Sequence, residues 1–162
     1  MNFKNLLVVI SIVSIAIISC KSAPVNPEVE NYIYKISPAL ALEELPIIKN
    51  FDSIPPEQFL YNKKIDSILQ SDIIDRYGNF IKKLDTITIK DPELKEIHAK
   101  YIDYAKHRLD YYNAFLVNLK GGLKNNSDTL NPIADQLKPL QNDYLKLLGN
   151  LVEKYQLEDP SK

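Results

Sequence analysis

The chain has almost no cysteine: Cys20 is the only one among its 162 residues. A single thiol excludes an intramolecular disulfide and a metal site built from several thiolates. Tryptophan is absent and there are only four glycines, and no glycine-rich phosphate-binding motif occurs. The 20 basic and 21 acidic residues nearly balance. Without a positive excess, electrostatic binding to nucleic acid has no support.

What the chain does have at its start is an uncharged apolar run. Residues 2–5 carry one positive charge, and residues 6–18 are then apolar except for two serines. As a helix this run would be about 20 Å long, short of the ~30 Å hydrocarbon core of a bilayer. A charged start followed by an apolar stretch of this length is typical of a secretory signal.

The run ends in Ile17-Ile18-Ser19-Cys20. These four residues resemble the lipobox of bacterial lipoprotein signals, although that motif usually has Leu where Ile17 stands and Gly or Ala where Ser19 stands. The resemblance covers the first 20 residues only. It implies cleavage before Cys20 and lipidation of its thiol with diacylglycerol, whose acyl chains (palmitate, for example) anchor a protein to a membrane. An ordinary signal peptide with an unrelated cysteine, and an uncleaved signal anchor, are the alternatives.

The same resemblance implies a location. In bacteria with two membranes, Asp directly after the lipidated cysteine favours retention at the inner membrane, whereas here Lys21 follows Cys20. We therefore expect the outer membrane if the host has one, and otherwise the extracellular face of the cytoplasmic membrane.

The chain is expected to hold one folded domain, since about 140 residues follow the signal. Pro24, Pro27 and their polar neighbours predict a tether, whose sixteen residues would reach at most about 55 Å. A short helix over residues 27–36 capped by Asn26, or a strand at residues 32–34, are the alternatives. The predicted segments are a signal peptide (1–19), a lipidated N-terminus and tether (20–36), a helical bundle (37–158) and a tail (159–162).

Beyond the tether, apolar residues recur at spacings of three and four, the pattern of amphipathic helices. We predict an all-α fold, an antiparallel three-helix bundle with a possible short fourth helix at residues 38–45 that starts at Ser37 and ends before Pro46. Asp91 and Pro92 suit the start of the second long helix, and Pro139 should kink or divide the third. The predicted long helices cover about 55–84, 91–121 and 131–155, with an extended linker at 85–91.

No arrangement of residues predicts catalysis, a cofactor or a metal ion. His98 and His107 lie nine positions apart, on opposite faces of one helix, and we expect both at the surface or its boundary. The carboxylates of Glu43 and Glu44 should diverge and lie at an exposed position. No serine or cysteine nucleophile occurs in a known catalytic motif.

The most unusual patch lies on the second long helix. Tyr101, Tyr104, Arg108 and Tyr111 fall within about 100° of one another, on one flank of its apolar face. An arginine in such a place needs an acid or an aromatic ring as its partner. The patch is either packing between helices, with Arg108 paired to a carboxylate from another helix, or a ligand-binding groove.

Together these features predict a lipid-anchored envelope protein, not an enzyme, whose helical domain is an interaction or structural module. Its expected partners are the membrane, through the lipid, and another envelope protein or cell-wall material. The alternative is a binder of a small ligand, glycan or peptide that uses Tyr101, Tyr104, Arg108 and Tyr111. Oligomeric state is left open.

Overall fold

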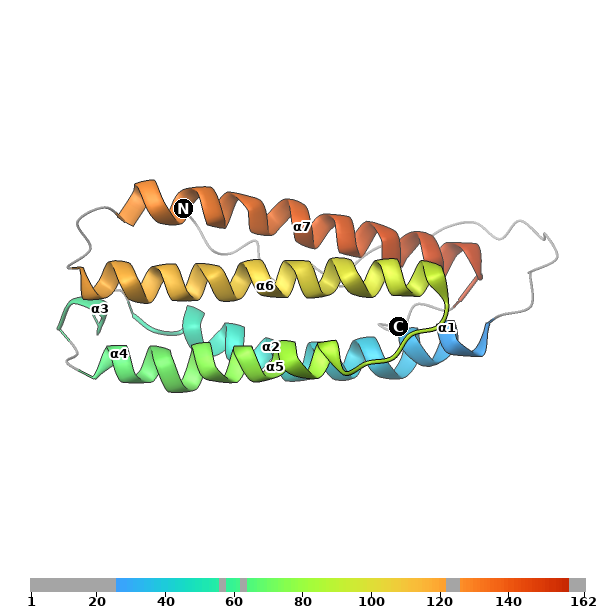
Figure 1. Ribbon diagram of the computed structural model, residues 1–162, viewed down its shortest axis with the longest axis horizontal. Coiled ribbons are helices and arrows are strands. Elements are labelled where there is room, and N and C mark those ends of the chain that lie inside the picture. The colour runs from blue at the N-terminus through green and yellow to red at the C-terminus, as the bar shows by residue number, and fades with distance from the viewer. Residues whose placement is uncertain (1–25, 56–57, 62–63, 122–125, 158–162) are drawn as a thin grey trace.

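The computed structural model describes residues 26–55, 58–61, 64–121 and 126–157, and these contain helices and no strand. Four long helical stretches run side by side and alternate in direction (Figure 1). The first stretch packs on the second, the second on the third, and the third on the fourth. The elements are α1 (Pro27–Asn31), η2 (Tyr32–Ile36, π-helical), α2 (Ser37–Asp52), α3 (Gln58–Tyr61), α4 (Ile65–Ile68), η3 (Leu69–Asp75, π-helical), α5 (Arg76–Asp85), α6 (Pro92–Lys120) and α7 (Asn126–Lys154).

The all-α prediction is confirmed. The three-helix arrangement is not confirmed, because the fourth helix, predicted as a possible short one, is a full-length stretch. It begins at α1, inside the segment predicted to be a tether. Val29, Tyr32 and Ile33 from this segment are buried in the core. The Asn26 side chain accepts a hydrogen bond from the Glu28 backbone N–H at 2.9 Å, which caps α1. The bundle therefore begins at about residue 26, eleven residues before its predicted start at residue 37, and the alternative of a helix over residues 27–36 capped by Asn26 is the one that the structure matches.

The first stretch also continues beyond its predicted end at Pro46. This proline lies inside α2 and is exposed. Proline removes one backbone hydrogen bond and frees the carbonyl four residues earlier, here that of Leu42, which is exposed as well. Because water can satisfy a carbonyl on this face, the helix continues to Asp52. Ser37 is not an N-cap, since η2 leads into it without a break.

The second stretch runs from α4 through η3 to α5. The helix predicted over residues 55–84 is interrupted, since α3 is a separate single turn. From residue 65 onward the predicted spacing of three and four holds, and it places one face in the core. The fully packed positions on this face are Ile65, Leu69, Ile73, Tyr77, Phe80 and Leu84.

The linker at residues 86–91 connects α5 to α6, and its last residues form hydrogen bonds with the start of α1. Asp91 caps α6, as predicted, by accepting a hydrogen bond from the Leu94 backbone N–H at 2.9 Å. Its other oxygen accepts from the Asn26 side chain at 2.9 Å. The Glu28 carboxylate accepts from the backbone N–H groups of Lys90 and Asp91, both at 2.8 Å. The starts of α1 and α6 therefore hold each other in place.

The fourth stretch, α7, is one helix that Pro139 does not divide. It begins five residues before the predicted start, and Pro132 and Pro139 both face solvent. It ends where Gln156 adopts a φ of 52° and the Leu157 backbone N–H bonds to the Val152 carbonyl at 3.0 Å. None of the described helices is both long and apolar enough to cross a membrane.

Candidate functional site

A buried carboxylate lies at the centre of the bundle. Glu44 is in phase with Leu40 and Ile47 on the inner face of α2 and is only 7% exposed. It accepts a hydrogen bond from the Tyr77 hydroxyl of α5 and another from the Tyr101 hydroxyl of α6, the latter at 2.7 Å. One charged group thus joins three of the four helical stretches.

Tyrosine rings extend this polar core to the fourth stretch. The rings of Tyr101 and Tyr144 stack with centroids 4.8 Å apart and an interplanar angle of 16°. The Tyr144 hydroxyl on α7 shares a hydrogen bond of 3.3 Å with the Ser37 hydroxyl on α2. Ser37, predicted as a helix cap, therefore links α2 to α7.

A second set of polar groups in the core is centred on His98. This residue is buried, whereas the sequence predicted it at the surface or its boundary. Its Nε2 lies 3.0 Å from the Leu84 carbonyl, and its Nδ1 lies 3.0 Å from the Tyr32 hydroxyl. A carbonyl oxygen only accepts, so Nε2 carries the proton and Nδ1 accepts from Tyr32. His98 is thereby occupied on both nitrogens, in a structural role.

Arg108 supplies the opposite charge. Its Nη2 donates to the Tyr104 hydroxyl one turn earlier on α6, and its guanidinium carbon lies 5.0 Å from the centre of that ring. The predicted carboxylate partner is not found, because no described acid forms an ion pair with it. Nε of Arg108 and the hydroxyl of Tyr112 are both buried without a hydrogen-bond partner in the described part of the chain.

A cluster of aromatic rings packs between α2 and α6 next to Arg108. The Phe51 ring from α2 meets three rings of α6, with centroid distances of 4.7 Å to Tyr112, 5.3 Å to Phe115 and 6.0 Å to Tyr111. Tyr111 is only partly buried, so its ring closes the edge of the core. The cluster fills the space between α2 and α6 beside Arg108.

Burial controls the ionisation of these groups. It raises the pKa of Tyr77 and of Tyr101, and the negative charge of Glu44 raises both further. Burial raises the pKa of Tyr104 to about 12, although the Arg108 cation acts in the opposite direction. These phenols are therefore neutral hydrogen-bond donors at physiological pH. Burial also raises the pKa of Asp52, against the effect of Arg108.

The structure brings Tyr101, Tyr104 and Arg108 into one interior network, with Tyr111 at its edge. Tyr104 is 2% exposed and Tyr101 5%, so these two rings are covered by neighbouring helices. Cys20, the predicted lipidation site, lies outside the described residues. Nowhere in the described ranges do three or more His, Cys, Asp or Glu residues form a group able to hold a metal ion.

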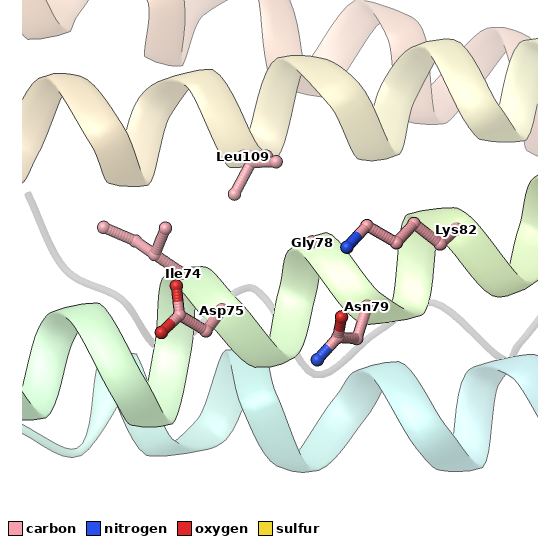
Figure 2. Close-up of a pocket in the computed structure, with 6 residues that line it drawn as sticks. All are labelled: Ile74, Asp75, Gly78, Asn79, Lys82 and Leu109. Atoms are coloured by element: carbon pink, nitrogen blue, oxygen red, sulfur yellow. The ribbon is translucent and has the colours of Figure 1, made fainter.

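Two shallow surface depressions lie elsewhere. One, of about 460 Å³, lies between α5 and α6, and its rim carries Asp75, Asn79 and Lys82, with Leu109 opposite (Figure 2). A Cβ at Gly78 would meet no atom within 4 Å, so the missing side chain helps to leave this hollow open. The other, of about 440 Å³, lies between His107 and α7. Neither depression is lined by the tyrosine and arginine residues predicted to bind a ligand.

Sequence reasoning missed Glu44, and it placed Tyr77 on the core face without predicting that its hydroxyl binds a carboxylate. Glu44 was expected at an exposed position beside Glu43, but only Glu43 is exposed, where it pairs with Lys83 of α5. The signal was present: Glu44 follows Leu40 by four positions and precedes Ile47 by three. A charged residue at a core position of an amphipathic helix indicates a buried partner on another helix.

No family model, curated protein or solved structure matches the chain. The residues described above are therefore the basis for a functional proposal.

The Glu44 network gives a first prediction. Replacing Glu44 by Leu leaves the Tyr77 and Tyr101 hydroxyls buried without an acceptor, which costs about 1–3 kcal/mol for each. We expect Glu44→Leu to lower the free energy of unfolding, measured by urea denaturation, by about 2–5 kcal/mol. Glu44→Gln should cost less, because its amide oxygen still accepts.

The matched control removes the hydroxyls as well. In a Tyr77→Phe, Tyr101→Phe background, Glu44→Leu should cost much less, because no unpaired polar atom remains. Equal costs in the two backgrounds would show that the hydroxyls do not bind Glu44.

The tyrosines give a second prediction, on alkaline stability. A tyrosine in an unfolded chain ionises near pH ~10, whereas Tyr104 in the fold ionises at about 12. The folded state therefore holds protons that the unfolded state has lost, and stability falls as pH rises above about 10. Tyr104 alone should contribute a loss of about 2–3 kcal/mol by pH ~12.

We expect tyrosinate absorbance and the loss of helical circular dichroism to rise together over this pH range. Full ionisation of the tyrosines with the helical signal intact would contradict the buried network.

Proposed function

We propose that this protein is a lipid-anchored protein of the bacterial cell envelope, held at the membrane through Cys20. The observation that carries this proposal is the lipobox-like Ile17-Ile18-Ser19-Cys20 at the end of a short apolar run. The helical bundle beginning at residue 26 supports it, because a folded domain then follows directly after the anchor.

We propose that the bundle acts through contact, as an interaction or structural module, and not through catalysis. The polar groups of its core support this, because they already bind one another. The hydroxyls of Tyr77 and Tyr101 are used by Glu44, and both ring nitrogens of His98 are used by Tyr32 and Leu84. The proposed partners are the membrane itself and another envelope protein or cell-wall material. By the same resemblance, Lys21 after the anchor favours the outer membrane where the host has one.

The anchor is tested by Cys20→Ala, with Ser19→Ala as a matched control that keeps a small residue before the cysteine. Cells are fed an alkyne-bearing fatty acid, and the protein is then purified and weighed by mass spectrometry. We expect the wild type and Ser19→Ala to incorporate the label and to lose residues 1–19. Cys20→Ala should do neither. Label on Cys20→Ala, or an unlabelled wild type, would contradict the proposal.

A second candidate function is binding of a small anionic ligand at Arg108. The observation that favours it is a pair of neighbouring buried donors, Nε of Arg108 and the hydroxyl of Tyr112. In the described part of the chain neither atom forms a hydrogen bond of normal geometry, although the two side chains affect each other's pKa. An anion reaching this end of the core could accept from both. The covered positions of Tyr101 and Tyr104 weigh against a wide groove, so the ligand would have to be small.

The chain has two arginines, which supplies a matched pair of variants: Arg108→Met, and Arg76→Met at an exposed position of α5. This candidate predicts that phosphate, sulfate or a sugar acid raises the melting temperature of the wild type and of Arg76→Met, but not of Arg108→Met. Without ligand, Arg108→Met should lower stability by about 1–3 kcal/mol, because the buried Tyr104 hydroxyl loses its partner, so each thermal shift is measured against the ligand-free form of the same protein. The same thermal shift in all three proteins would exclude Arg108 as the binding group.

A further inference from the structure

The outer face of η2 and α2 carries large apolar side chains that are not part of the core. Leu42 is 75% exposed, Leu45 46% and Tyr34 40%. Pro38, Leu42 and Leu45 follow one another at spacings of four and three, so they form a stripe along one side of the helix. The stripe lies opposite the positions of α2 that face the core. The bundle thus leaves an apolar surface on its first helical stretch.

Exposed lysines lie at both ends of this stripe. Lys35 is one position after Tyr34, and Lys49 is one turn beyond Leu45. The nearby acids are Glu30, which is exposed one turn before Tyr34, Glu43, which is ion-paired with Lys83, and Asp52 at the end of α2. An apolar stripe between cations suits a surface that is apolar within and negatively charged at its edge, as an anionic bilayer is.

The short covalent distance between Cys20 and the bundle is the reason to propose the bilayer as the partner of this stripe. Asn26 follows Cys20 by six positions, and six residues reach at most about 20 Å when extended. The first stretch, from Pro27 to Asp52, has 26 residues and is about 39 Å long. A short tether keeps the local concentration of lipid around this helix high, so a stripe too small to bind a membrane from solution still binds.

We propose that the stripe formed by Tyr34, Pro38, Leu42 and Leu45 lies on the membrane in which Cys20 is anchored, with Lys35 and Lys49 at lipid phosphates. The proposal rests on the lipid anchor proposed above. The first helical stretch then lies along the bilayer surface. Tyr34 suits such a place, because tyrosine combines an apolar ring with a polar tip that favours the membrane–water interface.

The chain has no tryptophan, so a single introduced one reports its own surroundings. Leu42→Trp is compared with Val117→Trp, whose site on α6 is also an exposed apolar residue, at 70%. Each full-length lipidated variant is reconstituted into vesicles of phosphatidylcholine and phosphatidylglycerol, with and without brominated acyl chains. We expect brominated lipid to quench Leu42→Trp at least threefold more strongly than Val117→Trp.

The outcomes separate this proposal from the anchor. If both variants float with the vesicles and are quenched equally weakly, the docking proposal is wrong while the anchor stands. Should neither variant float with the vesicles, both proposals are wrong. A blue-shifted Leu42→Trp emission without quenching would show that protein covers the stripe, and would overturn docking on lipid.

A second pair of variants tests the charges. Lys35→Glu with Lys49→Glu in the Leu42→Trp background should lower the quenching at least twofold in vesicles that contain phosphatidylglycerol. Lys82→Glu, on α5, is the control and should leave it unchanged. Equal quenching of all three proteins would contradict the role of the lysines.

Discussion

The fold depends on placing the Glu44 carboxylate where two tyrosine hydroxyls meet it. A buried carboxylate costs several kcal/mol of desolvation in a typical protein, and hydrogen bonds from partners already in place offset that cost. Tyr77 and Tyr101 come from two different helices. If α5 or α6 slipped by one turn, the charge would lose a donor. The polar core thus selects one alignment of helices that an all-apolar core would define less strictly.

Arg108 brings a positive charge into the same interior. Tyr104 lies between the two charges, since both Glu44 and Arg108 affect its ionisation and its hydroxyl accepts from Arg108. Phenol groups suit this position, because their rings pack like apolar side chains while their hydroxyls bind either charge. Tyr77, Tyr101 and Tyr104 use both properties in this bundle. Opposite charges joined through tyrosines keep the core close to neutral without a direct ion pair.

The parts of this architecture that local signals determine were predictable, and the parts set by distant contacts were not. The spacing of apolar residues and the Asp91 cap predicted a helix over residues 91–121, and the structure has α6 at Pro92–Lys120, within one residue at each end. Pro27 and Pro46 were taken as signs of a tether and a helix end, yet both lie within helical turns. Pro27 stands in the first turn of α1, where a proline costs no helical hydrogen bond, and Pro46 lies on the solvent side of α2, where the freed carbonyl can reach water. Which side of α2 faces solvent depends on the rest of the fold. For the same reason Glu44 was placed outside: its partners lie 33 and 57 residues away.

The early start of the bundle shortens the tether that the proposed anchor would have. A tether of sixteen residues would let a domain move freely about 55 Å from the bilayer, whereas six residues allow about 20 Å. That distance is only about half the ~39 Å length of the first helical stretch. If Cys20 is lipidated as proposed, a domain held so closely would have few orientations that avoid the membrane, and its nearest helix would present one face to lipid. The proposed anchor would therefore explain why the first helical stretch carries the exposed apolar side chains of Leu42 and Leu45.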